Sequence, residues 1–482
     1  MAAQNESRWH NVDINQQNRV PRRAAFFAYE TLDKAQSFDK KKSANYLSME
    51  GMWKFNFVKD HNKRPTNFLA MAYILAVNPA ILGQAHMSHQ GVFLATAISA
   101  GAASIFMGLM ANYPVSLAPG MGVNALFTYT IVGQMGLSPE GALACVFVSG
   151  IIFVIITVTN IRRMIINAIP AQLKLAIGAG IGFFVAFVGL KNAGIVVASE
   201  STFVSLGNFK NPTVLLALFG IIITLVLLVK NKPAAVFYGL IITAVVGVVF
   251  GSFFGLKGMP QLPTKLVSVN FDFSLVGAFA RGFNEMFTHP QCIVAIFSLL
   301  FVDFFDTAGT LVAVASKADL IDENGELVNV ERALLADAVG TVFGSMIGTS
   351  TVTSFVESTS GVGVGGRTGL TACTTGICFL LTVFFYPVLS MITDAVTAPA
   401  LVIVGILMAS QLKDIKWDNL IFAASGFVTI IFMILGYSIS NGIALGFIVY
   451  VISMIATGQA KDINKMVWVL FLLFIAYFAF LI

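Results

Sequence analysis

Four carboxylates interrupt otherwise apolar stretches of this chain. Asp303 and Asp306 stand three residues apart, so on a helix they share one face. Glu357 lies in a segment rich in Gly, Ser and Thr, and Asp337 lies in a less apolar run. A carboxylate at the middle of a bilayer costs about 3 kcal/mol even on a lenient scale, so such groups usually have a function. They can accept paired N–H bonds from a heterocycle and can carry a proton.

These carboxylates differ in their predicted roles. We predict a functional role for Glu357 and Asp306. Asp303 is a secondary candidate, and helix-to-helix hydrogen bonding is its alternative explanation. For Asp337 we favour a structural role near the membrane interface.

The composition of the chain requires a bilayer. Of its 482 residues, 57% are hydrophobic and only 11% are charged, against about 25% charged in soluble proteins. Residues 1–67 carry the whole net charge of +5, so the remainder is neutral. The basic balance is therefore no nucleic-acid footprint, and we expect residues 68–482 to lie in lipid.

Apolar runs near the bilayer-spanning length of about 20 residues recur along the chain. Together with three interrupted or short segments and a marginal one, they make 14 or 15 candidate spans. The continuous candidates are 92–110, 138–158, 172–190, 213–230, 235–254, 291–313, 369–390, 396–411, 419–436, 440–457 and 466–482; the interrupted ones are 68–83, 117–134 and 349–366; the marginal one is 331–347.

Basic residues between the spans predict an orientation. They gather in gaps that fall on one side if every span crosses the membrane, and the positive-inside rule makes that side cytoplasmic. The N-terminus is then cytoplasmic, while segment 466–482 breaks the parity and leaves the side of the C-terminus open. The basic residues are Arg162, Arg163, Lys174, Lys230, Lys232, Lys413 and Lys416.

Two segments broken by Gly and Pro occupy matching positions in the two halves of the chain, Tyr113–Asn124 and Thr349–Arg367. Each begins with residues that can be extended and then turns helical. Non-helical backbone inside a membrane must be paired or line a wet cavity, so the two stretches could pair with each other. The helix N-termini after them would direct positive dipole ends toward a ligand. Residues 211–251 and 418–458 also repeat in rhythm, a pattern typical of secondary carriers with inverted repeats. A kinked helix without a ligand role is the alternative.

Other motifs carry less information. The four cysteines lack metal-ligand spacing, and His86 and His89 lack a third ligand nearby. Gly361–Gly369 looks like a phosphate loop, but no Lys-Ser/Thr follows it, and close helix packing explains its glycines. We therefore expect no metal, no cofactor and no enzyme activity.

Residues 68–482 resemble the adenine/guanine/hypoxanthine permeases, the AzgA-like branch of the nucleobase–cation symporter family. The resemblance implies an all-α polytopic membrane protein with about 14 transmembrane segments in two inverted seven-span repeats. It also implies core and gate domains and two short extended segments at the midplane. The matching motifs are Phe68–Pro79, Leu117–Ala125, Asp306–Leu311 and Gly348–Leu370.

The resemblance also implies a substrate site between the two broken spans. The family's site carboxylates match Asp306 and Glu357, and its third-span site residues match Gly122 and Asn124. Phe355 is a further substrate-binding candidate, since a phenylalanine ring can stack on a flat ligand.

The implied function is uptake of a purine base, guanine/hypoxanthine or adenine, across the cell's inner membrane. Symport with a cation, commonly a proton held by Asp306 or Glu357, would drive it. A homodimer stays open as an assembly, and no nucleic-acid partner is expected. A uracil or xanthine carrier of the same fold, an anion carrier and an inactive chimera are the alternatives.

Residues 1–67 do not belong to that family. Their motifs Asn18–Arg22, Ala24–Tyr29 and Leu47–Phe57 resemble the start of a family 2 β-galactosidase, whose catalytic carboxylates have no counterpart here. We expect this fragment to be poorly ordered. The junction leaves Phe68–Leu82, about 15 residues and short of a full span, so the first helix is expected to be incomplete.

Overall fold

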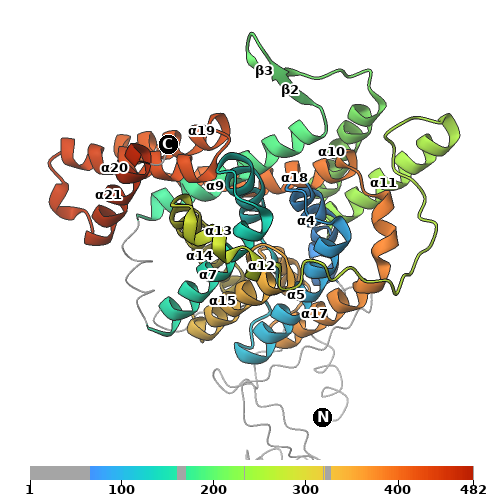
Figure 1. The fold of residues 1–482 in the computed structure, drawn as a ribbon, viewed down its shortest axis with the longest axis horizontal. Coiled ribbons are helices and arrows are strands. Elements are labelled where there is room, and N and C mark those ends of the chain that lie inside the picture. The colour runs from blue at the N-terminus through green and yellow to red at the C-terminus, as the bar shows by residue number, and fades with distance from the viewer. Residues whose placement is uncertain (1–65, 160–169, 233, 319, 321–326, 481–482) are drawn as a thin grey trace, which may run out of the picture. The chain divides into compact units, whose positions relative to one another are not determined.

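The structure, a computed structural model, describes residues 66–159, 170–232, 234–318, 320 and 327–480. The β-galactosidase-like fragment up to residue 65 and the basic residues Arg162 and Arg163 lie outside the described residues. Helices make up most of the described chain (Figure 1). The elements up to residue 288 are α3 (Thr66–Met71), α4 (Ile74–Gly83), α5 (His89–Met110), β1 (Leu117–Pro119), α6 (Met121–Ala125), η5 (Leu126–Gln134), α7 (Pro139–Val158), α9 (Ala171–Asn192), β2 (Val196–Ser199), β3 (Phe203–Leu206), α10 (Pro212–Val229), α11 (Ala235–Phe254), α12 (Ala278–Arg281) and α13 (Phe283–Thr288).

The second half begins in the order of the first, with two helical segments, one broken segment and then further helices. Its elements are α14 (Gln291–Lys317), α15 (Val330–Ile347), β4 (Val352–Ser354), α16 (Ser358–Gly363), α17 (Gly369–Thr382), η6 (Val383–Met391), α18 (Asp394–Ala409), η7 (Ser410–Asp414), α19 (Leu420–Leu435), α20 (Ile439–Ala456), η8 (Ala460–Asp462) and α21 (Lys465–Phe480).

The helices have the length and composition of membrane spans. Ten helical stretches of the described residues are long and apolar enough to cross a bilayer, and α19 and α21 are apolar but shorter. This confirms the all-α polytopic fold class, while the exact count of 14 spans stays a prediction.

The first span is complete, so the expectation of a truncated helix at Phe68–Leu82 is wrong. Thr66–Gly83 forms an apolar stretch of 18 residues made of α3 and α4. Asn67 is buried because its side-chain amide donates hydrogen bonds to Ser116 Oγ (2.8 Å) and Thr375 Oγ1 (3.0 Å). Because Asn67 has buried hydrogen-bond partners, Thr66 and Asn67 can extend the helix ahead of the apolar run that begins at Phe68.

The helices pack into two groups, the core and gate groups, that match the expected core and gate domains. In Figure 1, α5 lies beside α17, and the same core group contains α4, α7, α14 and α15. The gate group pairs α9 with α18 and includes α10, α11, α19 and α20.

The predicted repeat of residues 211–251 and 418–458 forms two similar helical hairpins. In each, a glycine of the second helix packs against a threonine of the first. A Cβ on Gly239 would lie 2.0 Å from Thr224 Oγ1, and one on Gly446 would lie 1.8 Å from Thr429 Oγ1. Only a glycine allows this approach, so both hairpins are closed by the same small-residue contact.

Two short antiparallel sheets occur among the described residues. In the first, β1 pairs with β4, with Ala118 opposite Thr353. This confirms the predicted pairing of the two broken segments. In the second, β2 pairs with β3 in a hairpin that extends beyond the end of α9 (Figure 1). The sequence patterns did not predict this hairpin.

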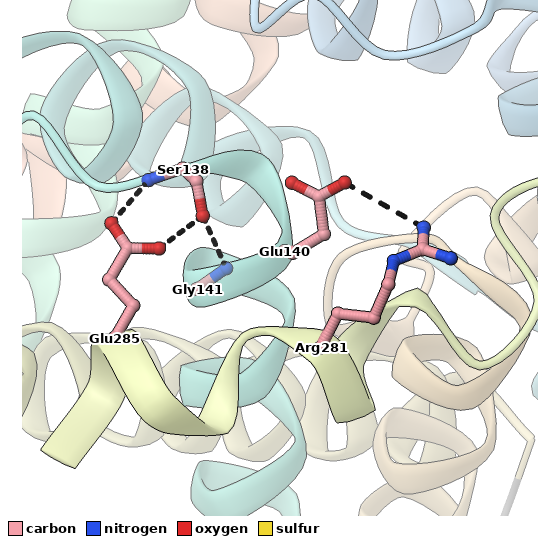
Figure 2. A network of polar contacts seen from close by, with 5 residues as sticks. All are labelled: Ser138, Glu140, Gly141, Arg281 and Glu285. Carbon is pink, nitrogen blue, oxygen red and sulfur yellow. Dashed lines mark hydrogen bonds and ion pairs between the residues drawn. The ribbon is translucent and has the colours of Figure 1, made fainter.

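The segment between α11 and α14 is fastened to the core group. Figure 2 shows Glu285 of α13 accepting hydrogen bonds from the Ser138 backbone N–H (2.8 Å) and hydroxyl at the start of α7. Arg281 of α12 pairs with Glu140 at 3.7 Å, although both side chains are exposed. Ser138 caps α7, since its hydroxyl accepts from the Gly141 N–H at 3.0 Å, and Glu285 binds the N–H of this N-cap residue as the glutamate of a capping box would.

The same segment is also fastened to the start of α5. The Asp272 carboxylate accepts hydrogen bonds from the Ser88 hydroxyl and, at 3.0 Å, from the Ser274 backbone N–H. These bonds, that from Ser88 first, lower the pKa of Asp272. The linker between the two halves is therefore held by charge-assisted contacts near its middle, at Asp272, and near its end, at Glu285.

Candidate functional site

The candidate site lies at the short antiparallel sheet in which β1 pairs with β4, which we call the crossing. All six residues of the two strands are buried, so their backbone groups need partners within the protein. The strand pairing supplies some of these. Ser104 supplies more, since its hydroxyl accepts from the Leu117 N–H at 2.9 Å and donates to the Leu117 carbonyl at 3.0 Å. The strand pairing and the Ser104 bonds together fix the backbone of the two strands at the crossing.

Glu357 follows β4 and precedes α16. Its side chain is partly exposed, and its Oε1 accepts a hydrogen bond of 2.5 Å from the buried Tyr73 hydroxyl. Tyr73 stands directly before α4, so this bond joins the second broken span to the first span of the fold. One carboxylate edge remains available to a ligand.

Tyr73 is a site residue that the sequence reasoning missed. It appears in the family motif Phe68–Pro79, but no role was assigned to it. The only available signal was a hydroxyl within an apolar run. Its partner is 284 residues away in the sequence.

Asp306 lies on α14 beside the same strand. Its side chain is partly exposed. It interacts with the Thr353 hydroxyl and lies within electrostatic reach of Glu357 and Asp337. The structure therefore brings Asp306 and Glu357, 51 positions apart in the sequence, within electrostatic reach of each other beside β4.

Asp303 and Asp337 are fully buried and link helices to one another. Thr341 on α15 donates to Asp303 on α14 at 3.1 Å, which is the helix-to-helix bond named as the alternative for this residue. Asp337 accepts from Thr307 at 2.7 Å and from Ser354 at 2.9 Å. These bonds fit the structural role expected for Asp337, while its expected place near the membrane interface stays a prediction.

Asn124, on α6, is fully buried beside the crossing. Its Oδ1 accepts from the Ser350 hydroxyl. Its Nδ2 has no hydrogen-bond partner within the described part of the chain. A buried amide without a partner is costly, so a ligand or water is expected to accept from it.

The two other residues named from the sequence have packing roles in the structure. Gly122 faces α9, where a Cβ would lie 2.6 Å from Ile181 Cγ2. Phe355 is 4% exposed, and its backbone N–H donates to the Ser116 carbonyl at 3.1 Å. Gly122 thus permits close contact between a core helix and a gate helix, and Phe355 extends the strand pairing.

The helix that follows β4 is short. This helix is α16, which has six residues, so the dipole contribution predicted for its N-terminus is small. The five residues of α6, in contrast, run directly into the nine of η5. The site instead offers side-chain groups, namely two partly exposed carboxylates, the Tyr73 hydroxyl and the Asn124 amide. Such a set can bind the N–H and acceptor edges of a polar ring.

Comparisons with known proteins agree with this architecture. The sequence profile of the "Permease family" matches residues 65–445. The chain is 48% identical over 431 residues to the guanine/hypoxanthine permease PbuG of Bacillus subtilis, covering 86% of this chain and 95% of that protein. It is 41% identical over 409 residues to the adenine permease AdeQ of Escherichia coli, covering 85% of this chain and 90% of the relative.

Solved structures support the fold. The transmembrane domain of the cyanobacterial bicarbonate transporter BicA aligns with a TM-score of 0.55 at 14% identity, over 79% of this chain and 97% of that domain. SLC26A9 aligns with a TM-score of 0.56 at 14% identity, over 82% of this chain and 65% of that protein. At this identity the likeness shows the fold alone. The sequence match over most of its length shows that the chain belongs to the permease family.

Proposed function

We propose that this protein takes up purine nucleobases across the cell's inner membrane as a secondary transporter. The observation that carries the proposal is the pair of partly exposed carboxylates, Glu357 and Asp306, at the crossing of β1 and β4. In a permease whose relatives are named for guanine/hypoxanthine and adenine, these acceptors suit the N–H groups of a purine.

The proposed contacts divide between the two edges of the base. Glu357, held on one side by Tyr73, accepts from one purine edge. Asp306 bonds the other edge or holds the coupling proton. The Asn124 amide donates to a ring nitrogen or carbonyl, which would satisfy its buried Nδ2.

The proposed coupling ion is a proton. A carboxylate within electrostatic reach of a second carboxylate, as Asp306 is of Glu357, can load and release one. Abolition of uptake by a protonophore, with unchanged uptake in sodium-free buffer, is the expected result. Sodium-dependent uptake that survives the protonophore would overturn proton coupling.

The proposed orientation has a cytoplasmic N-terminus. Among the described residues, Lys174 at the start of α9, Lys230 and Lys232 after α10, and Lys413 and Lys416 after α18 support it by the positive-inside rule. On this topology, Asp272 and Glu285 face the outside.

We further propose that residues 68–482, together with Thr66 and Asn67 of α3, form the transport domain and that the residues before them are a separate fragment. A chain that starts at residue 65 is then expected to retain uptake. Loss of uptake in that shortened chain, at equal membrane abundance, would argue against a dispensable fragment.

The test of function is uptake of radiolabelled hypoxanthine by cells that lack their own purine permeases. Unlabelled guanine, adenine, hypoxanthine, xanthine and uracil serve as competitors. Competition by guanine or adenine as well as by hypoxanthine, with uptake abolished in Glu357→Gln, is the expected result. Competition by uracil or xanthine alone would favour a different base carrier of the same fold. Normal uptake by Glu357→Gln would refute the assignment of the site, and Glu331→Gln on the exposed start of α15 is the matched control.

A further inference from the structure

A cavity of about 250 Å³ lies apart from the carboxylates, where α4, the first residue of α5 and the start of α18 meet. We call it the α4–α18 cavity. α4 packs with the core group and α18 with the gate group, so the cavity lies at the boundary of the two. Boundaries of this kind are frequent places for small-molecule sites.

The cavity lies along the face of α4 on the side of Tyr73, the residue that is hydrogen-bonded to Glu357. Ala76 and Ala80 line it, and they follow Tyr73 by three and seven residues. Residues at this spacing share a helix face. At 1.5 Å per residue, they lie about 5 to 11 Å along α4 from Tyr73, the residue that binds Glu357.

Three polar side chains line the cavity. Thr393 precedes α18, yet its side chain makes no capping hydrogen bond there. Its hydroxyl oxygen is buried without a hydrogen-bond partner among the described residues. Asp394 and His89, the first residues of α18 and α5, complete the polar lining and lie within electrostatic reach of each other. The lining thus offers a carboxylate, an imidazole and a free hydroxyl.

The remaining wall of the cavity is apolar. Leu389 and Ile392 line it together with the two alanines. The volume lies below the range of about 300–1,000 Å³ usual for ligand pockets, so it suits a single flat base rather than a nucleotide.

We propose that the α4–α18 cavity is a second docking site for the purine base, occupied on the path between water and Glu357. This inference rests on the proposed function. The Asp394 carboxylate accepts from a ring N–H, and the Thr393 hydroxyl and the His89 imidazole bond the acceptors of the ring. The base then passes along the α4 face to Tyr73 and Glu357.

The first test compares uptake kinetics of variants in the cavity wall. Thr393→Val removes the hydroxyl at nearly constant volume and is expected to raise the KM for hypoxanthine about three- to tenfold, with the maximal rate kept. Thr393→Ser retains the hydroxyl and is expected to restore the KM. Ala80→Leu fills the cavity and raises the KM, whereas Ala456→Leu, at the exposed end of α20, is the matched control. A KM in Thr393→Val and Ala80→Leu equal to that of Ala456→Leu would overturn the proposal.

A second test separates the two sites. Purified Glu357→Gln protein is expected to keep weak binding of hypoxanthine, detected by saturation-transfer NMR, and Glu357→Gln/Ala80→Leu is expected to lose it. Absence of binding in the single variant would overturn the second site. Absence of both binding and uptake in the unmodified protein would instead refute the proposed function, so the two failures are distinguishable.

Discussion

Asp337→Ala is expected to destabilise the fold, because Asp337 joins α15 to both α14 and β4. The change removes the hydrogen bonds from Thr307 (2.7 Å) and Ser354 (2.9 Å). A bond to a charged group contributes about 1.5–3 kcal/mol, which gives about 3–6 kcal/mol for two. Thr307 can fall back on Thr353, whose hydroxyl lies 2.9 Å away. The lower half of the range, about 3–4.5 kcal/mol, is therefore expected.

The assay for this prediction is thermal denaturation of the purified protein in detergent, followed by size-exclusion chromatography. Ser354→Ala removes one of these bonds and is expected to cost about half as much. Thr307→Val removes the bond to Thr353 as well as the bond to Asp337, so it is expected to cost more than Ser354→Ala. Asp306→Asn, whose side chain is partly exposed, is expected to keep the thermal stability and to lose uptake. Unchanged stability in Asp337→Ala would refute the assignment of Asp337 as a structural link.

Three further changes test separate contacts. Tyr73→Phe removes the hydroxyl that binds Glu357 and is expected to lower kcat/KM for uptake at least tenfold; an unchanged value would exclude this donor. The lowered pKa of Asp272 means that its stabilising contribution is complete above its ordinary pKa and is lost as pH falls through the lower folded value. Thermal stability should fall below about pH 4, and less steeply in Asp272→Asn; identical pH profiles would contradict this. Glu285→Ala is expected to cost about 0.5–2 kcal/mol, as loss of a helix cap does, and to speed amide exchange in the first turn of α7. Glu140→Ala breaks only an exposed ion pair and should change little; equal effects of the two would contradict the capping role.

Local patterns were sufficient to predict much of the architecture. Apolar runs near the bilayer-spanning length indicate helices wherever they occur. The two Gly- and Pro-broken segments, 113–124 and 349–367, are similarly local signals, and their pairing follows because unpaired backbone is costly inside a membrane. The carboxylates Asp306 and Glu357 stood out because charge is rare in such stretches.

Features that depend on distant partners escaped prediction. Nothing near Tyr73 in the sequence indicates that its hydroxyl binds Glu357 rather than lipid headgroups. Asp337 lies in a run of low hydropathy that resembles a membrane edge, and nothing in that run indicates its bonds to Thr307 and Ser354. The first helix looked incomplete because the polar partners of Asn67 are themselves far along the chain.

The buried and the partly exposed carboxylates form two classes. Asp303 and Asp337 lie inside the core group and bind hydroxyls of neighbouring elements. Asp306 and Glu357 reach accessible space beside the same strand. Residue type and spacing do not separate the two classes, since Asp303 and Asp306 lie on the same helix. The exposure of the side chains does separate them.

The central claim is that the accessible carboxylates bind the transported base. Its most direct test is counterflow of labelled hypoxanthine in liposomes that contain the purified protein. The unmodified protein and Asp303→Asn are expected to exchange the base, and Glu357→Gln and Asp306→Asn are expected to exchange none. Exchange by Glu357→Gln at the rate of the unmodified protein would contradict the account.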